Sequence, residues 1–296
     1  MKKFALLILA AATVWPESRE VVYRTTPQGE LKIHLYQPPG WKATDKRPAI
    51  VLFFGGGFTG GAPVQFFSKA EYLARRGMVA ASAEYRILNK HKTTPESAIE
   101  DCRAAVAWMR AQASELGIDP NRLAVGGGSA GGTCAAATAY APDQASRPNA
   151  LVLYNPSMES SPERLAARMK DSPADKIEMV AGLLSPVRHV RAGGPPSIQF
   201  FGTEDALLAG ARKFVEKARA KGNRAELYTA KGQAHGFFNE RPNTGHWHLA
   251  TLRATDVFLA SLGYLKGAPL IEAPANAVLE PVTPGSPVPP APQTDR

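Results

Sequence analysis

The sequence predicts an α/β protein built on a mainly parallel central sheet with helices on both faces. Two observations favour this class. Short apolar runs alternate with helical patterns along most of the chain, and several of these runs lack polar interruptions, as strands covered on both faces do. The 296 residues suffice for one large domain with a substantial core, and the sequence shows no internal repeat and no second core.

The first elements are expected to be strands. Residues 21–40 (VVYRTTPQGELKIHLYQPPG) predict an antiparallel strand pair joined by a Pro-Gly turn. In its second half, Leu31, Ile33 and Leu35 alternate with polar neighbours, as in a half-buried strand. Residues 48–58 (PAIVLFFGGGF) then form an uninterrupted apolar run that is typical of a strand covered on both faces.

The rest of the chain alternates between the two patterns. The clearest helix is expected at residues 94–117, which open on Thr-Pro-Glu and place small and apolar residues on one face. The other helices are expected at 64–77, 133–140, 210–222 and 248–263, and the other strands at 78–86, 122–128, 150–157, 195–205 and 225–238. Residues 157–190 break the alternation and predict an inserted, cap-like region of short helices and loops.

The two ends of the chain differ in composition from the main domain, which we expect at residues 17–266. Two lysines, an apolar stretch and an Ala-x-Ala site at Ala10 and Ala12 predict a secretory signal peptide over residues 1–16. A buried N-terminal strand or helix is the alternative. The signal peptide implies a secreted or periplasmic protein. Residues 267–296 are rich in proline without a packing period, so we expect a tail that is disordered or loosely draped over the domain.

Composition limits the possible partners. The chain has 35 Lys and Arg against 26 Asp and Glu, a net charge of +9. No basic block with interleaved aromatic residues accompanies this excess, so we interpret it as a solvated surface and expect no nucleic-acid partner. No apolar run is long enough to span a membrane. Cys102 and Cys134 match no metal-ligand spacing, and we expect buried free thiols, although export leaves a disulfide open.

The most informative motif is the glycine-rich stretch between the strand at 122–128 and the following helix. Gly127-Gly128-Ser129-Ala130-Gly131 matches G-x-S-x-G, which in a strand–turn–helix context is typical of a nucleophile elbow. The turn strains the serine backbone and leaves no room for side chains two residues before and after it. The helix that follows directs its N-terminus at the site, which favours a developing negative charge. A phosphate-binding loop is a weaker interpretation, because no Lys-Ser/Thr follows the glycines.

A serine nucleophile requires an oxyanion hole, a base and an acid. The second glycine cluster ends the strand at 48–58, so we assign the backbone N–H groups of Gly56 or Gly57, together with Ala130, to the oxyanion hole; a loose turn is the alternative. The chain order serine, acid, histidine favours His235, which is presented beside a glycine in GQAHGFF. The other histidines are His34, His91, His189, His246 and His248. We prefer Asp205 of FFGTED as the acid, with Glu204 or Glu159 as the fallback carboxylates.

Four ordered motifs, PAIVLFFGGGF, GIDPNRLAVGGGSAGG, FGTEDA and GQAHGFF, resemble the α/β-hydrolase esterases, notably bacterial secreted carbohydrate esterases and lipase-like carboxylesterases. The resemblance extends from about residue 20 to 265. It implies the α/β-hydrolase fold, a Ser129–His235–Asp205 triad and ester hydrolysis without metal or cofactor. Two departures stand out. Phe54 takes the place of a histidine that commonly precedes the glycine triplet in relatives, and DALLAG replaces an Asp-x-x-Val-Pro-like turn after Asp205.

The substrate is less well defined. We expect the region 157–190 to shape one wall of the pocket, and Phe58, Phe238 and Trp247 to line a groove. Export and the resemblance favour acetyl or feruloyl esters on plant-type polysaccharides. A general short-chain carboxylesterase or lipase-like enzyme is the alternative, and a non-catalytic binding protein with a hydrolase fold is a third possibility from another class. A prolyl-oligopeptidase-type peptidase is disfavoured, because the chain has no room for the usual propeller domain. The sequence does not predict an oligomeric state.

Overall fold

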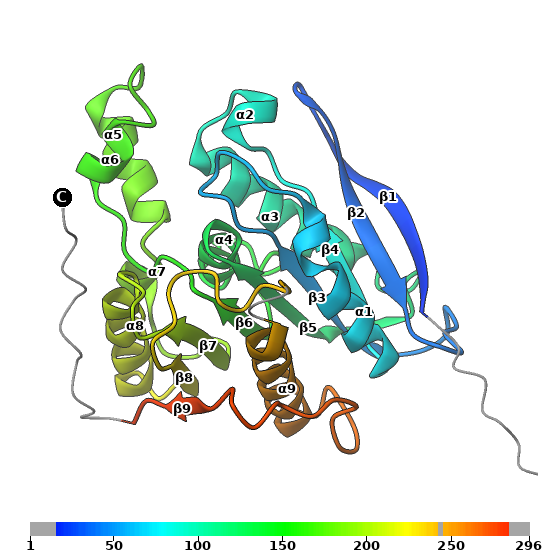
Figure 1. Ribbon diagram of the computed structural model, residues 1–296. Coiled ribbons are helices and arrows are strands. Elements are labelled where there is room, and N and C mark those ends of the chain that lie inside the picture. The colour runs from blue at the N-terminus through cyan, green and yellow to red at the C-terminus, as the bar shows by residue number, and fades with distance from the viewer. Residues whose placement is uncertain (1–15, 242–244, 284–296) are drawn as a thin grey trace, which may run out of the picture.

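A computed structural model describes residues 16–241 and 245–283 and confirms the predicted α/β class. Its centre is a nine-stranded sheet with the order β1-β2-β4-β3-β5-β6-β7-β8-β9 (Figure 1). The strands from β4 to β8 in that order run parallel, whereas β1, β2 and β9 join antiparallel at the edges. The strands are β1 (Glu17–Thr26), β2 (Gly29–Gln37), β3 (Arg47–Phe53), β4 (Val79–Ala83), β5 (Ile118–Gly128), β6 (Ala150–Tyr154), β7 (Ser197–Gly202), β8 (Ala225–Ala230) and β9 (Leu279–Pro281).

Helices cover both faces of this sheet. The chain passes from β3 to β4 in one direction and from β4 back past β3 to β5 in the other, so right-handed crossovers place the connecting helices on opposite faces. The helical elements are η1 (Pro63–Phe66), α1 (Phe67–Arg75), α2 (Leu88–His91), α3 (Pro95–Ala111), α4 (Ala130–Thr138), α5 (Pro162–Ala166), α6 (Ala174–Leu183), α7 (Pro186–His189), α8 (Leu208–Ala220) and α9 (Gly245–Ser261). Helices α1 and α9 are tied together by Asp256, which accepts hydrogen bonds from Tyr72 and Arg76.

Burial follows the sequence pattern. Every residue of β4, β6 and β7 is buried, and β2 buries Leu31, Ile33 and Leu35 while the residues between them are less buried. The helix expected at 94–117 ends at Ala111, because the following turn is bound elsewhere: Trp41 Nε1 donates to Leu116 O, and Arg47 N donates to the next carbonyl. Cys102 and Cys134 are buried free thiols.

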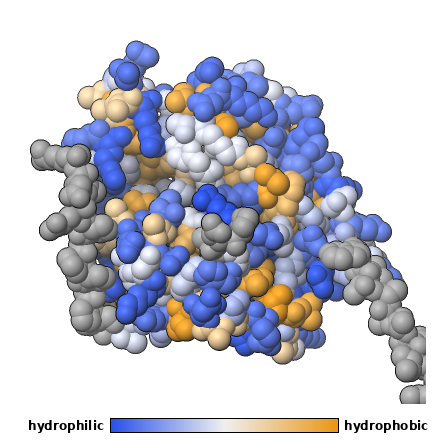
Figure 2. Space-filling view, in the orientation of Figure 1, coloured by the Kyte–Doolittle hydropathy of each residue, from blue (hydrophilic) through white to orange (hydrophobic). Residues whose placement is uncertain are grey.

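Figure 2 shows a face on which hydrophilic residues alternate with small hydrophobic patches and which is hollowed beside the α5–α6 segment. Residues 157–190 hold α5, α6 and α7, the short helices that the sequence predicts there. Within the described ranges, no helix is long and apolar enough to cross a membrane, and no cluster of His, Cys, Asp and Glu could hold a metal ion. The expected signal peptide lies outside the described residues apart from its last position and stays a prediction.

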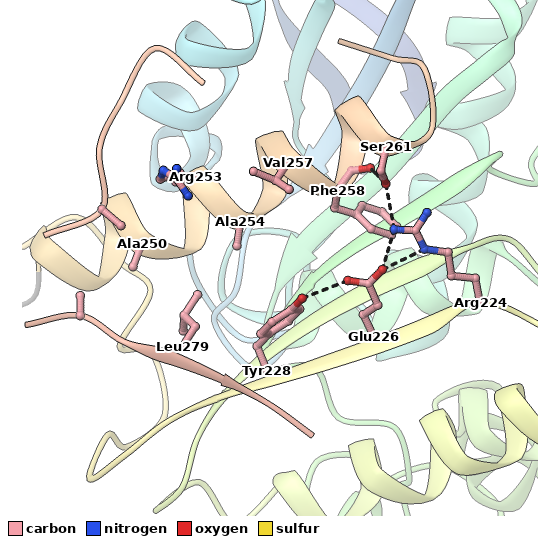
Figure 3. Close-up of a pocket in the computed structure, with 12 residues that line it drawn as sticks. Arg224, Glu226, Tyr228, Ala250, Arg253, Ala254, Val257, Phe258, Ser261 and Leu279 are labelled. Atoms are coloured by element: carbon pink, nitrogen blue, oxygen red, sulfur yellow. Dashed lines mark hydrogen bonds and ion pairs between the residues drawn. The ribbon is translucent and has the colours of Figure 1, made fainter. Parts of the chain in front are cut away.

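Of the two expectations for the tail, disorder is wrong for residues 267–283, which run along the domain and include β9. Strand β9 pairs with the edge strand β8, and Val282 N donates to Leu227 O at 2.8 Å, because an edge strand offers unpaired backbone groups. This segment closes a groove of about 450 Å³ against α9, where Arg224 bonds to Glu226 and Ser261 (Figure 3). Residues 284–296 lie outside the described part of the chain.

Candidate active site

Ser129 occupies the turn between β5 and α4 in a strained conformation. Its φ of 49° and ψ of −119° lie in a region that side chains with a β-carbon rarely adopt. Ser129 N donates to Tyr154 O at 2.8 Å, which holds the turn against β6. The side chain therefore stands clear of the sheet at the N-terminus of α4.

The flanking glycines make this turn possible. A β-carbon on Gly127 would lie 2.6 Å from Phe53 O and from the carbonyl carbon of Gly131, and one on Gly131 would lie 2.2 Å from Phe54 O. These neighbours are backbone atoms, which have no room to move aside. Hence no other residue fits either position without displacing β3 from β5.

The structure brings Ser129, His235 and Asp205 into one hydrogen-bonded chain. His235 Nε2 lies 2.9 Å from Ser129 Oγ, and His235 Nδ1 lies 2.8 Å from Asp205 Oδ2. Asp205 is buried, whereas the His235 side chain is 43% exposed and open to a ligand. The fallback carboxylate Glu159 instead pairs with Lys213 on the surface, and Glu204 is exposed. The geometry thus selects Asp205 among the three carboxylates.

Asn155 is a component of the site that the sequence analysis missed. Its Nδ2 donates to Asp205 Oδ2 at 2.5 Å, and its Oδ1 accepts from Gly236 N at 3.4 Å. The residue is fully buried and adopts a φ of 50°, a conformation that asparagine tolerates better than most residues. The only hint in the sequence is its place directly after β6. Asn155 fixes both the carboxylate and the loop that carries His235.

The second glycine cluster lies against the nucleophile. A β-carbon on Gly55 would be 3.1 Å from Ser129 Cβ, and Gly56, Gly57 and Phe58 follow with φ values of 135°, 62° and 64°. Gly57 and Ala130 line the same pocket as Ser129, and Gly56 is not among its lining residues. Within the described ranges, the N–H groups of these three expected oxyanion residues have no protein acceptor. They are thus free for a substrate oxygen.

Phe54 stands where relatives commonly have a histidine, and contacts with other residues hold it in place. Its ring stacks on Tyr85 with centroids 4.1 Å apart, and Tyr85 OH donates to Phe54 O at 2.6 Å. A chain of amides continues from there: Gly55 N donates to Gln65 Oε1, and Gln65 Nε2 donates to Asn239 Oδ1. Asn239 Nδ2 in turn donates to the carbonyl of the residue after His235. The glycine loop and the histidine loop are therefore positioned by one network.

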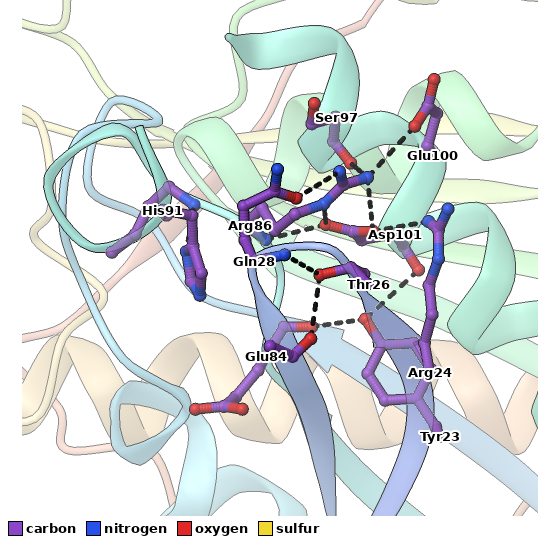
Figure 4. Close-up of polar contacts among 12 residues, drawn as sticks. Tyr23, Arg24, Thr26, Gln28, Glu84, Arg86, His91, Ser97, Glu100 and Asp101 are labelled. Carbon is purple, nitrogen blue, oxygen red and sulfur yellow. Dashed lines mark hydrogen bonds and ion pairs between the residues drawn. The ribbon is translucent and has the colours of Figure 1, made fainter. Parts of the chain in front are cut away.

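A buried ionic network supports the far end of the glycine loop (Figure 4). Asp101, which is fully buried, accepts hydrogen bonds from the backbone N–H and the guanidinium of Arg86 and from Arg24. These bonds fix the start of the segment that contains α2, which the sequence analysis did not predict. There, Leu88 N donates to Phe58 O at 2.9 Å. Asp101 thus anchors the glycine loop indirectly.

A pocket of about 330 Å³ opens above Ser129. Its lining combines apolar side chains with hydroxyl groups and two arginines, namely Gly57, Phe58, Ser129, Ala130, Thr133, Ser157, Ser160, Arg164, Leu165, Arg168, Leu184 and Leu207. The inserted region supplies one wall, as expected, and Leu207 of the DALLAG departure supplies part of another.

Phe58 lines this pocket, but the expectations for Phe238 and Trp247 are wrong. Phe238 is 2% exposed and packs beneath the nucleophile, where a β-carbon on Gly128 would meet its ring at 2.5 Å. Trp247 is also buried and packs edge-on against Phe237. Both rings belong to the hydrophobic core, Phe238 from the loop after His235 and Trp247 from the first turn of α9.

A buried lysine that the sequence analysis did not single out lies against Phe238. Lys69 Nζ lies 2.7 Å from His248 Nδ1 and donates to Phe238 O at 3.1 Å, above the rings of Tyr154 and Phe238. Burial lowers the pKa of Lys69 to about 7, although nearby Glu240 opposes this shift. Burial and the lysine charge lower the pKa of His248 to about 3, so its neutral Nδ1 accepts the hydrogen bond.

Lys69 gives a pH dependence of stability that can be measured. Its pKa is about 7 in the folded chain and 10.5 unfolded, so between these values the unfolded state binds more protons. The free energy of unfolding therefore gains up to about 1.4 kcal/mol per pH unit from this group as pH rises. The free energy of unfolding, measured with urea at pH 7 to 10, is expected to show this gain in the wild type. The control variant Lys46→Met, which removes an exposed lysine, is expected to show it as well. Lys69→Met is expected to lack it, and an equal slope in all three proteins would contradict the assignment.

The fold and the site define a class of protein: an α/β domain with a serine on a strand–helix turn, backed by histidine and aspartate. A family model described as the alpha/beta hydrolase fold matches residues 50–239. Esterase LipC of Mycobacterium tuberculosis is 32% identical over 250 residues, 74% of this chain and 59% of LipC. Carboxylesterase NlhH of the same organism is 28% identical, over 71% of this chain and 72% of NlhH. The chain thus spans less than two thirds of LipC.

Solved structures agree with these matches. An esterase from Thermogutta terrifontis with bound propionate has 38% identity and a TM-score of 0.76, covering 84% of this chain and 97% of that one. The chain therefore belongs to the α/β-hydrolase fold family. These relatives are described as esterases and carboxylesterases, which favours the general carboxylesterase alternative over the polysaccharide esterase.

Proposed function

We propose that the protein is a serine carboxylesterase that hydrolyses small carboxylic esters through an acyl-enzyme. The observation that carries this proposal is the continuous chain from Ser129 Oγ through both nitrogens of His235 to Asp205. A binding protein would not need a strained serine in contact with a histidine that is paired with a buried carboxylate.

The mechanism follows from the atoms in contact. Ser129 Oγ attacks the ester carbonyl carbon while His235 Nε2 takes its proton, and Asp205 stabilises the imidazolium. The N–H groups of Gly57 and Ala130, with Gly56 as the alternative in the loop, hold the oxyanion. The tetrahedral intermediate expels the alkoxide, which receives the proton from His235. Water then gives its proton to His235 and attacks the acyl carbon, and the acid leaves as Ser129 recovers its proton.

The pocket favours a small substrate. Its volume of about 330 Å³ lies at the lower end of the range for small-molecule sites, and Leu165, Leu184 and Leu207 give it an apolar wall. Related Thermogutta structures contain propionate and butyrate, which supports short acyl chains. Acetyl or feruloyl esters on polysaccharides, the first expectation from the sequence, have less support.

A substrate panel tests this proposal. We expect hydrolysis of 4-nitrophenyl acetate, propionate and butyrate, weaker hydrolysis of the long-chain palmitate, and no preferential release of acetate from acetylated xylan or of ferulate from arabinoxylan. No turnover of any short ester would contradict the proposed function. Efficient release from a polysaccharide with poor turnover of simple esters would restore the carbohydrate-esterase interpretation.

A further inference from the structure

Two arginines are the only charged side chains among the residues that line the pocket above Ser129. Arg164 and Arg168 lie four positions apart, in α5 and the turn after it, on either side of the buried Leu165. Arg168 N donates to Leu165 O at 2.8 Å, so the chain is still helical enough there to place both arginines on one side. The pocket therefore carries positive charge along its inserted wall.

Neither guanidinium is neutralised within the described part of the chain. Arg168 Nη1 donates to the carbonyl of Gly57 at 2.8 Å, which brings its charge beside the oxyanion loop and leaves its other N–H groups available. Arg164 has no ion pair and no side-chain hydrogen bond there. The acid of the triad, Asp205, is buried and does not line the pocket.

This arrangement suits a particular kind of ester. A guanidinium binds a carboxylate through two parallel hydrogen bonds, and such charge-assisted bonds are stronger than those between neutral groups. Ser160 adds a hydroxyl to this wall that can also donate to an anion, whereas the Ser157 hydroxyl already donates to Glu159 O at 2.8 Å. Positive charge at a pocket mouth also attracts anionic substrates from solution.

We propose that the preferred substrates are esters that carry a second, free carboxylate, which Arg164 and Arg168 bind while Ser129 attacks the ester carbonyl. This inference rests on the proposed esterase function and narrows its substrate class. The carboxylate can sit on the acyl part, as in a monoester of a dicarboxylic acid, or on the alcohol part. Both sources share the same chemistry, and the test separates them.

The test compares charged and neutral ester pairs. The acyl arm uses 4-nitrophenyl hemiglutarate against 4-nitrophenyl valerate, and the alcohol arm uses 4-carboxyphenyl acetate against 4-carbamoylphenyl acetate. In at least one arm, Arg164→Gln is expected to lower the charged-to-neutral ratio of kcat/KM by about tenfold. Arg168→Gln is expected to lower that ratio similarly and to slow the neutral ester as well, because it also loses the bond to Gly57.

The matched control is Arg19→Gln, which removes one exposed arginine of β1 that does not line the pocket. It changes the net charge equally, and we expect the ratio to stay within about twofold of wild type. Raising the salt concentration from about 0.02 M to 0.5 M is expected to lower the wild-type ratio more than that of Arg164→Gln.

The outcomes are distinguishable. Hydrolysis of the neutral esters with a ratio that neither Arg164→Gln nor Arg168→Gln changes in either arm would overturn the carboxylate preference and leave the esterase proposal standing. Absence of hydrolysis of every neutral and charged ester by the wild type would overturn both. Thermal unfolding of each variant verifies its fold, and since Arg164 is exposed, its midpoint is expected to match the wild type.

Discussion

Ser129→Ala is expected to lower kcat for 4-nitrophenyl butyrate by about 10⁴-fold or more while leaving the fold intact. The variant removes the oxygen that forms the acyl-enzyme, and no neighbouring hydroxyl lies within hydrogen-bond reach of His235 Nε2 in the described structure. Alanine keeps the β-carbon, so the strain at φ 49° is unchanged. Steady-state kinetics with circular dichroism as the fold check measures the effect.

Ser114→Ala serves as the matched control, because Ser114 is an exposed serine in the turn after α3. It is expected to retain wild-type turnover. Activity of Ser129→Ala close to that of this control would contradict the assignment of the nucleophile.

Asp205→Asn is expected to reduce kcat by about 10⁴-fold through the histidine tautomer. Asp205 Oδ2 accepts the proton of His235 Nδ1, which leaves Nε2 free to accept from Ser129. Asp205 accepts from Leu207 N at Oδ1 and from Asn155 Nδ2 and His235 at Oδ2, so no orientation of an amide satisfies all these donors, and the His235 proton is no longer held on Nδ1. The proton then moves to Nε2, which can no longer act as the base.

Glu204→Gln tests whether Glu204, rather than Asp205, is the acid of the triad. Glu204 neighbours Asp205 in sequence but is exposed, so its loss is expected to change kcat by less than about twofold. Loss of activity in Glu204→Gln with normal activity in Asp205→Asn would reverse the choice of acid.

Local signals account for what the sequence predicted well. The apolar runs of β3 and β6 predict strands that are buried on both faces, as in a covered parallel sheet. The glycines around Ser129 predict a tight strand–helix turn, because side chains at these positions would clash with the backbone. His235 followed from chain order and its glycine neighbour. These features depend on residues close together in the chain, so they can be recognised from the sequence alone.

Contacts between distant segments account for what was missed. Asn155 bonds to Asp205, which is 50 residues away in the sequence, and Lys69 contacts His248, which is 179 residues away. No local sequence pattern therefore marks Asn155 or Lys69. Phe238 and Trp247 flank the histidine loop in sequence, yet packing against the sheet turns them inward. Strand β9 depends on the open edge of β8, which a proline-rich composition does not reveal.

The most direct measurement of the central claim is covalent labelling of the nucleophile. The wild-type protein is incubated with paraoxon, and its intact mass and proteolytic peptides are determined by mass spectrometry. One diethylphosphoryl group on Ser129, with complete loss of esterase activity and no label on Ser129→Ala, is the result we predict. Inactivation with the label on another residue, or undiminished turnover without any label, would contradict the claim that Ser129 is the catalytic nucleophile.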